Sequence, residues 1–226
     1  MNFKIDGKTI SDIIIGLSDG LTVPFALAAG LAGAIAQSNI VLTAGLAELA
    51  AGGISMGLGG YLAAKSETDT YYAELKREQQ EIVECPEEEI AEVREILAGY
   101  GLQGNTLQAA VEGIIANREG WAQFMMKEEL GLEKPNPEQA LKTAFFIGGS
   151  YIIGGIVPLT PYAFGLTVKD AFYLSIFTTS IALIIFGAVK GKFTSIPPLK
   201  SALETFLVGS AAAFAAYSIA RLVQGH

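Results

Sequence analysis

Residues 40–64 read IVLTAGLAELAAGGISMGLGGYLAA, an apolar stretch that contains a single charged residue, Glu48. A helix of about 20 apolar residues is long enough to cross a lipid bilayer. Four further stretches meet the same criterion, and they lie at residues 10–36, 140–159, 171–189 and 199–222. The sequence therefore predicts an all-α polytopic membrane protein with five transmembrane helices.

The charged residues gather between the second and third predicted spans. Residues 65–138 hold 17 of the 23 acidic and 7 of the 15 basic residues, so their net charge is −10 while the rest of the chain carries +2. An acidic segment repels nucleic acid and attracts cations, so no nucleic-acid partner is expected. The predicted domains are spans one and two (1–64), an acidic helical insert (65–138) and spans three to five (139–226).

The insert is predicted to form three helices. Residues 65–83 continue the second span as a mostly polar helix. Pro86 then opens a second helix whose first turn, Glu87 to Glu89, suits the positive end of a helix dipole. A third helix is expected over residues 106–130, because apolar side chains recur there at helical spacing.

The distribution of lysine predicts the orientation in the membrane. Short loops on the cytosolic side of a membrane carry an excess of lysine and arginine. An odd number of spans places the N-terminal lysines and those of the fourth-to-fifth loop on one side: Lys4, Lys8, Lys190, Lys192 and Lys200. The N-terminus and the insert are therefore expected in the cytosol, and the first span is expected to be retained because no cleavage site follows it. The membrane would be the plasma membrane in a bacterium, and a vacuolar or other endomembrane in a eukaryote.

Carboxylates inside the predicted spans are the first candidates for function. Glu48 lies in the middle of span two, where a charge costs at least about 2–3 kcal/mol unless it faces a cavity or a partner. Asp12 and Asp19 share one face of span one, and Met56 lies on the same broad side of span two as Glu48. Carboxylates with a thioether suit a transition metal. The alternatives are that Asp12 caps its helix, that Glu48 is a neutral packing residue and that Met56 fills the core.

Two glycine patterns predict close helix packing. They are Gly16-x-x-x-Gly20 in span one and Gly53-x-x-x-Gly57 in span two. Small residues at this spacing let helices approach closely. The contact can lie within one chain or between two chains.

The insert carries carboxylates and thioethers at helical spacing. Residues three or four apart on a helix present two ligands on one face. The candidate ligands are Glu78 with Glu81, Glu89 with Glu92, and Met125 and Met126 with Glu129. The alternative is a solvated acidic surface.

Several other chemistries are excluded by the residues themselves. The only histidine is residue 226, so a Ser/His/Asp or Cys/His site and the Glu-x-x-His pattern of ferritin-like di-iron proteins are absent. Cys85 is the only cysteine, which excludes an intrachain disulfide. No Walker loop is present, so this chain is not expected to bind and hydrolyse ATP.

Three motifs give the chain a specific resemblance. They are GLSDGLTVPFAL at 16–27, AELAAGGISMGLG at 47–59 and GGIVPLTPY at 154–162. With the insert they cover nearly the whole chain, which resembles the vacuolar iron transporter family of yeast and plant vacuolar iron and manganese transporters and bacterial relatives. The resemblance implies five spans, a cytosolic three-helix metal-binding insert, a homodimer and exchange of divalent metal against protons.

The resemblance also implies roles for individual residues. It assigns the membrane path to Asp19, Glu48 and Met56, and the insert sites to Glu78, Glu81, Glu89, Glu92, Met125, Met126 and Glu129. The expected function is export of Fe²⁺, and of Mn²⁺, from the cytosol by metal/proton antiport, with no organic cofactor and no enzymatic activity. Two alternatives remain, a membrane-attached carboxylate di-metal oxidase and a metal sensor that does not transport.

Overall fold

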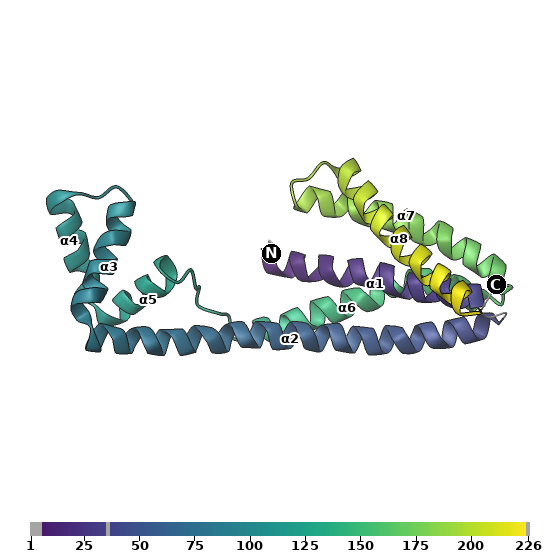
Figure 1. Cartoon of the computed structure of the whole chain (residues 1–226), viewed down its shortest axis with the longest axis horizontal. Coiled ribbons are helices and arrows are strands. Elements are labelled where there is room, and N and C mark those ends of the chain that lie inside the picture. The colour runs from purple at the N-terminus through teal and green to yellow at the C-terminus, as the bar shows by residue number, and fades with distance from the viewer. Residues whose placement is uncertain (1–5, 35–36, 225–226) are drawn as a thin grey trace, which may run out of the picture. The chain divides into compact units, whose positions relative to one another are not determined.

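The computed structural model describes residues 6–34 and 37–224 (Figure 1). Within these residues every regular element is a helix. In chain order they are α1 (Gly7–Ala34), α2 (Ser38–Glu84), α3 (Pro86–Gly99), α4 (Gly104–Ile115), α5 (Arg118–Glu128), α6 (Gln139–Leu159), the 3₁₀ helix η1 (Thr160–Phe164), α7 (Val168–Phe193) and α8 (Pro198–Gln224). The predicted all-α class is confirmed.

Five helices in the described residues are long and apolar enough to cross a membrane. They are α1, α2, α6 with η1, α7, and α8 as far as Val223. The chain divides into two compact units. We call Met1–Leu62 with Ala140–His226 the membrane unit, and Ala63–Gln139 the insert unit. Helix α2 contributes to both units, since it is continuous from Ser38 to Glu84.

The start of α1 is capped by Asp6. Its Oδ1 atom accepts a hydrogen bond of 2.6 Å from the backbone N–H of Thr9, which satisfies one of the free amides at the helix start. The alternative that Asp12 caps this helix is therefore wrong. Asp12 is buried and accepts a hydrogen bond from Thr143 of α6.

The glycines of α1 and α2 provide room for α6. A Cβ atom at Gly20 would collide with the backbone of Tyr151, and one at Gly16 would collide with Ser150. On α2, a Cβ at Gly57 would lie 3.0 Å from the carbonyl oxygen of Ala144. Both glycine patterns therefore serve contacts within one chain.

One core cluster of the membrane unit is formed by buried residues from α1, α2, α6, η1 and α7. Its members are Ala28, Val41, Leu49, Tyr151, Leu159, Tyr162 and Ala171. We call it the membrane cluster. On the outside, large apolar side chains are exposed, among them Ile54 at 63% and Phe145 at 74%. An apolar exterior of this kind is what a hydrocarbon environment requires.

The insert unit has its own apolar core, which we call the insert cluster. It is formed by Ile82, Val93, Leu97, Val111, Trp121, Ala122 and Met125. The single helix expected over residues 106–130 is instead two helices, α4 and α5. Asn117 separates them, because its Oδ1 accepts hydrogen bonds from the backbone N–H groups of Glu119 (3.1 Å) and Gly120 (3.3 Å). A side chain that caps a new helix start interrupts the preceding one.

Candidate metal sites

Glu48 lies on the first half of α2 and is half-buried in the membrane unit. The hydroxyl of Tyr151 on α6 donates a hydrogen bond to its Oε1 atom. Its Oε2 atom is buried and has no hydrogen-bond partner among the described residues. An unpartnered carboxylate oxygen in an apolar span is costly unless a proton, a cation or a hydrogen-bond donor satisfies it. This oxygen is therefore a candidate ligand.

The other two predicted path residues lie on the same helices as the glycine contacts. Asp19 of α1 is half-buried, and both its carboxylate and that of Glu48 act electrostatically on the Tyr151 phenol. Met56 of α2 is half-buried and packs against the membrane cluster. Glu48 on α2 thus contacts Tyr151 directly, and Asp19 on α1 lies near enough for its charge to act on the same phenol. Met56 supplies a thioether at the edge of the cluster that contains this tyrosine.

A pair of buried carboxyl groups forms the centre of the acidic site in the insert unit. Glu78 of α2 is 1% exposed and Glu89 of α3 is 6% exposed, and their side chains share a hydrogen bond. Burial, then this hydrogen bond, then the charge of Glu89 raise the pKa of Glu78 to about 8. Oε1 of Glu78 and Oε2 of Glu89 have no partner in the described part of the chain. The pair therefore holds a proton at neutral pH and has oxygens free for a ligand.

The remaining glutamates gather around this pair. Burial first, and then the charge of Glu92, raise the pKa of Glu129, the C-cap residue that follows α5. The pKa of Glu89 is raised first by burial and then by Glu92, Glu81 and Glu129, against the lowering effect of its bond to Glu78. The charges of Glu81, Glu92 and Glu129 therefore all act on the buried pair.

One of these glutamates already has a cationic partner. Arg77 lies between Glu74, at 2.7 Å, and Glu81, at 3.3 Å. This exposed network partly neutralises the acidic site. Over residues 6–34 and 37–224, no three His, Cys, Asp or Glu side chains converge closely enough to hold a metal ion. A metal ion held by three of these carboxylates would therefore require them to move closer together.

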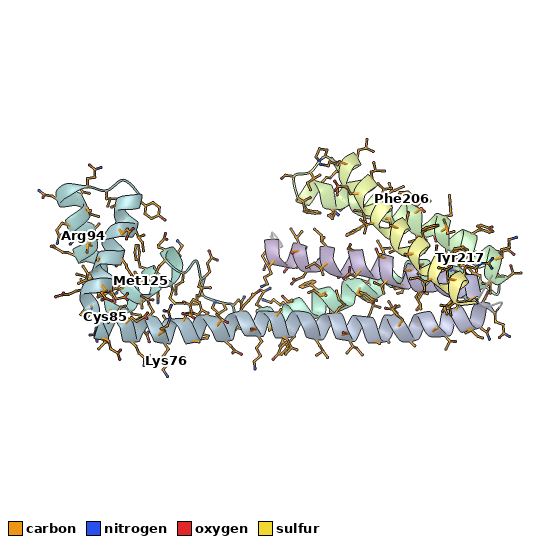
Figure 2. All side chains as sticks on the ribbon, viewed as in Figure 1. Lys76, Cys85, Arg94, Met125, Phe206 and Tyr217 are labelled. Atoms are coloured by element: carbon orange, nitrogen blue, oxygen red, sulfur yellow. The ribbon has the colours of Figure 1, made fainter. Side chains whose placement is uncertain are left out.

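The two predicted methionine ligands are buried in the insert unit. Met125, labelled in Figure 2, is a member of the insert cluster together with Val93 and Trp121. Met126 is equally buried but does not belong to that cluster. Each residue is followed at helical spacing by Glu129. The structure thus places both thioethers inside the unit, where Met125 also fills its core.

Two polar residues of α6 that contact carboxylates were not predicted from the sequence. Thr143 bonds to Asp12, and Tyr151 bonds to Glu48. The two residues are eight positions apart on an apolar helix, which puts them on the same broad side of it. A polar stripe of this kind on a predicted span is a signal that could have found them.

Comparison with known proteins places the whole chain in one family. The model of the VIT family matches residues 10–221. The chain is 57% identical to vacuolar iron transporter 1 of Eucalyptus grandis and 56% identical to that of Arabidopsis thaliana. Each alignment covers 96% of this chain and 88% or 87% of the relative. It is 38% identical to protein CCC1 of Saccharomyces cerevisiae, over 97% of this chain and 70% of that protein. The chain therefore belongs to the VIT family of vacuolar iron transporters, which are transporters and not enzymes.

Proposed function

We propose that this protein transports divalent iron, and Mn²⁺ with it, out of the cytosol in exchange for protons. The observation that carries the proposal is Glu48, whose Oε2 atom is buried in the apolar first half of α2 and has no partner among the described residues. A proton, a cation or a hydrogen-bond donor would satisfy such an oxygen, and a cation is the one that a transporter has to bind. Membership of a family whose curated relatives are named vacuolar iron transporters supports iron as the cargo.

The exchange follows from the chemistry of a carboxylate. Glu48 binds a metal ion only after it has lost its proton. A site that takes metal on one side of the membrane and protons on the other therefore couples the two fluxes. Asp19 and Met56 complete the path as an oxygen and a sulfur ligand, a set that favours Fe²⁺ over Mg²⁺.

The insert unit has a separate role in this proposal. Its glutamates collect metal in the cytosol and raise the local concentration at the entrance of the path. The proton held by Glu78 and Glu89 is released when metal binds. The lysine distribution supports the cytosolic location of the unit and of the N-terminus.

We propose a homodimer as the working unit, as the family resemblance implies. The glycine patterns do not support it, because both are occupied by α6 of the same chain. Helix α2 nevertheless presents Ile54, Leu58 and Leu62 at four-residue intervals, and all three are exposed. This stripe suits a second copy as well as lipid. The mass of the protein in nanodiscs should correspond to two chains, and a transport-active monomer would contradict the proposal.

Flux measured in proteoliposomes tests the function. Purified protein is reconstituted with a metal-sensitive dye or a pH-sensitive dye inside the vesicles, and Fe²⁺, Mn²⁺, Co²⁺, Zn²⁺ or Mg²⁺ is added outside. We expect Fe²⁺ entry to be accompanied by proton exit, and Glu48→Gln to abolish both. Metal binding without flux would indicate a sensor. Oxygen consumption on addition of Fe²⁺ would indicate an oxidase.

A further inference from the structure

Tyr151 is a buried residue of α6 that contacts a carboxylate of the membrane unit. Its side chain is 2% exposed, and its hydroxyl donates to Oε1 of Glu48. Gly52, one turn after Glu48 on α2, makes room for it. A Cβ atom at Gly52 would lie 2.5 Å from the Tyr151 hydroxyl and 2.7 Å from the ring atom that bears it. The phenol is thus fixed against α2 at the level of the carboxylate.

The hydrogen bond distinguishes the two oxygens of Glu48. A tyrosine hydroxyl has one hydrogen to donate, and here that hydrogen is directed at Oε1. Oε2 remains buried and without a partner among the residues that the structure describes. The phenol therefore restricts rotation of the carboxylate and determines which oxygen stays free.

We propose that Tyr151 is a positioning residue that holds Glu48 so that Oε2 is the ligand for the transported cation. This inference rests on the proposed function, in which Glu48 binds the metal. A ligand fixed in advance loses less conformational freedom when it binds. Loss of the phenol hydroxyl should therefore weaken cation binding more than it slows movement of the bound ion.

The direct test is Tyr151→Phe, which removes the hydroxyl and keeps the ring. We expect KM for Fe²⁺ in proteoliposomes to rise about tenfold, the size expected for one hydrogen bond to a charged group, with kcat changed less than about twofold. Tyr162→Phe is the matched control. Tyr162 belongs to the same membrane cluster and is also 2% exposed, but its hydroxyl has no partner in the described residues. Its KM should equal that of the wild type.

A second pair of variants, both on α2, tests the same hydrogen bond by displacing the phenol. Gly52→Ala places a methyl group against the phenol and should displace it, with the same rise in KM. Gly59→Ala, on the same helix, meets no atom within 4 Å and should leave KM unchanged. This pair keeps the test valid if Tyr151→Phe proves unstable, and thermal unfolding of all four variants reports their folding.

A double-mutant cycle separates positioning from general packing. Co²⁺ affinity is measured in the whole protein for Glu48→Gln, Tyr151→Phe and the double variant. If Tyr151 acts through Glu48, Tyr151→Phe has no further effect once Glu48 is replaced. Additive losses of Co²⁺ affinity would overturn the positioning role alone. So would a KM for Tyr151→Phe equal to that for Tyr162→Phe, provided that the wild type transports. Unchanged flux in Glu48→Gln would overturn both this inference and the proposed function.

Discussion

The hydroxyl of Thr143 on α6 donates a hydrogen bond of 2.8 Å to Oδ2 of Asp12 on α1, and both side chains are buried. The two residues are 131 positions apart in sequence. The bond satisfies an oxygen of a carboxylate near the start of the first span. It therefore ties α6 to α1 through a polar contact in addition to their glycine packing.

Removing this contact should destabilise the membrane unit. Thr143→Val keeps the shape of the side chain and leaves a buried carboxylate oxygen without its donor, which costs about 1–3 kcal/mol. Thermal unfolding in detergent should show a lower Tm. Thr205→Val is the control, because the one bond of the buried Thr205 hydroxyl within the described residues is a 2.8 Å bond to the carbonyl of Ser201 in its own helix. Equal decreases in Tm in the two variants would show that the bond to Asp12 contributes no more to stability than a bond within one helix.

Substitutions in the membrane path should reduce flux strongly. Asp19→Ala, Glu48→Ala and Met56→Ala each remove a ligand or proton site where water does not substitute, so we expect at least about a tenfold loss of Fe²⁺ flux in proteoliposomes. Glu204→Ala is the control, since Glu204 is an exposed acid on α8 that pairs with Lys200. Full flux in the three path variants would place the path elsewhere.

The insert site should be more tolerant of substitution than the path. Alanine at all five insert glutamates (Glu78, Glu81, Glu89, Glu92 and Glu129) should abolish metal binding to the insert unit and leave partial flux. The reason is that a site that collects ions changes their local concentration and not the barrier within the membrane. Calorimetry on the whole protein measures binding, and proteoliposome flux measures transport. Unchanged binding would identify these glutamates as a solvated surface.

The stability of the insert unit should fall as pH rises. Glu78 has a pKa of about 8 in the fold, above its ordinary value of 4.5, so between these values the folded state holds more protons than the unfolded state. Stability is therefore greatest below about pH 4.5 and decreases up to about pH 8. Trp121, the only tryptophan, is buried in the insert cluster, so its fluorescence reports thermal unfolding of this unit.

The metal-free protein is the sample for this experiment. Glu78→Gln should flatten the dependence of Tm on pH, because an amide does not titrate. Glu88→Gln, an exposed change on α3, should preserve it. The Tm is measured between about pH 5 and 8, which lies between the unfolded and folded pKa values of Glu78. A wild-type Tm that rises over this range would contradict the assigned protonation of Glu78.

Replacing Met125 or Met126 should weaken the binding of soft metal ions more than that of hard ones. Met125→Leu and Met126→Leu conserve volume in the buried positions, so a core role alone costs less than about 1.5 kcal/mol of stability. A ligand role predicts that Co²⁺ and Fe²⁺ affinities fall while Mg²⁺ affinity is unchanged. Calorimetry with each ion distinguishes the two. Equal changes for all ions would assign these residues to packing.

The topology can be tested at one position. Cys85 is the only cysteine, and it is exposed between α2 and α3 (Figure 2). We expect a membrane-impermeant thiol reagent to label it in sealed vesicles only when their cytosolic face is outward. Cys85→Ser provides the background signal. Labelling from the opposite face would invert the orientation derived from the lysines.

The sequence by itself determined the five apolar helices and the acidic character of the segment between the second and third. Hydrophobicity and charge belong to each stretch of residues wherever it lies in the fold, so residues 40–64 predict a membrane helix without knowledge of its neighbours. The apolar residues on both sides of Glu48 likewise singled it out as a charge inside a predicted span. The break at Asn117 was missed because capping of α5 competes with a continuous helical pattern, and the pattern alone does not rank the two.

Only the tertiary structure decided which side chains meet. The glycine patterns were compatible with close packing against any helix, and in the fold these glycines pack against α6 of the same chain. That packing brings Thr143 to Asp12 and Tyr151 to Glu48, and it leaves Oε2 of Glu48 unpaired within the described residues. Pairings between residues more than 100 positions apart depend on how whole helices pack against one another, and this packing is a property of the complete chain rather than of any segment.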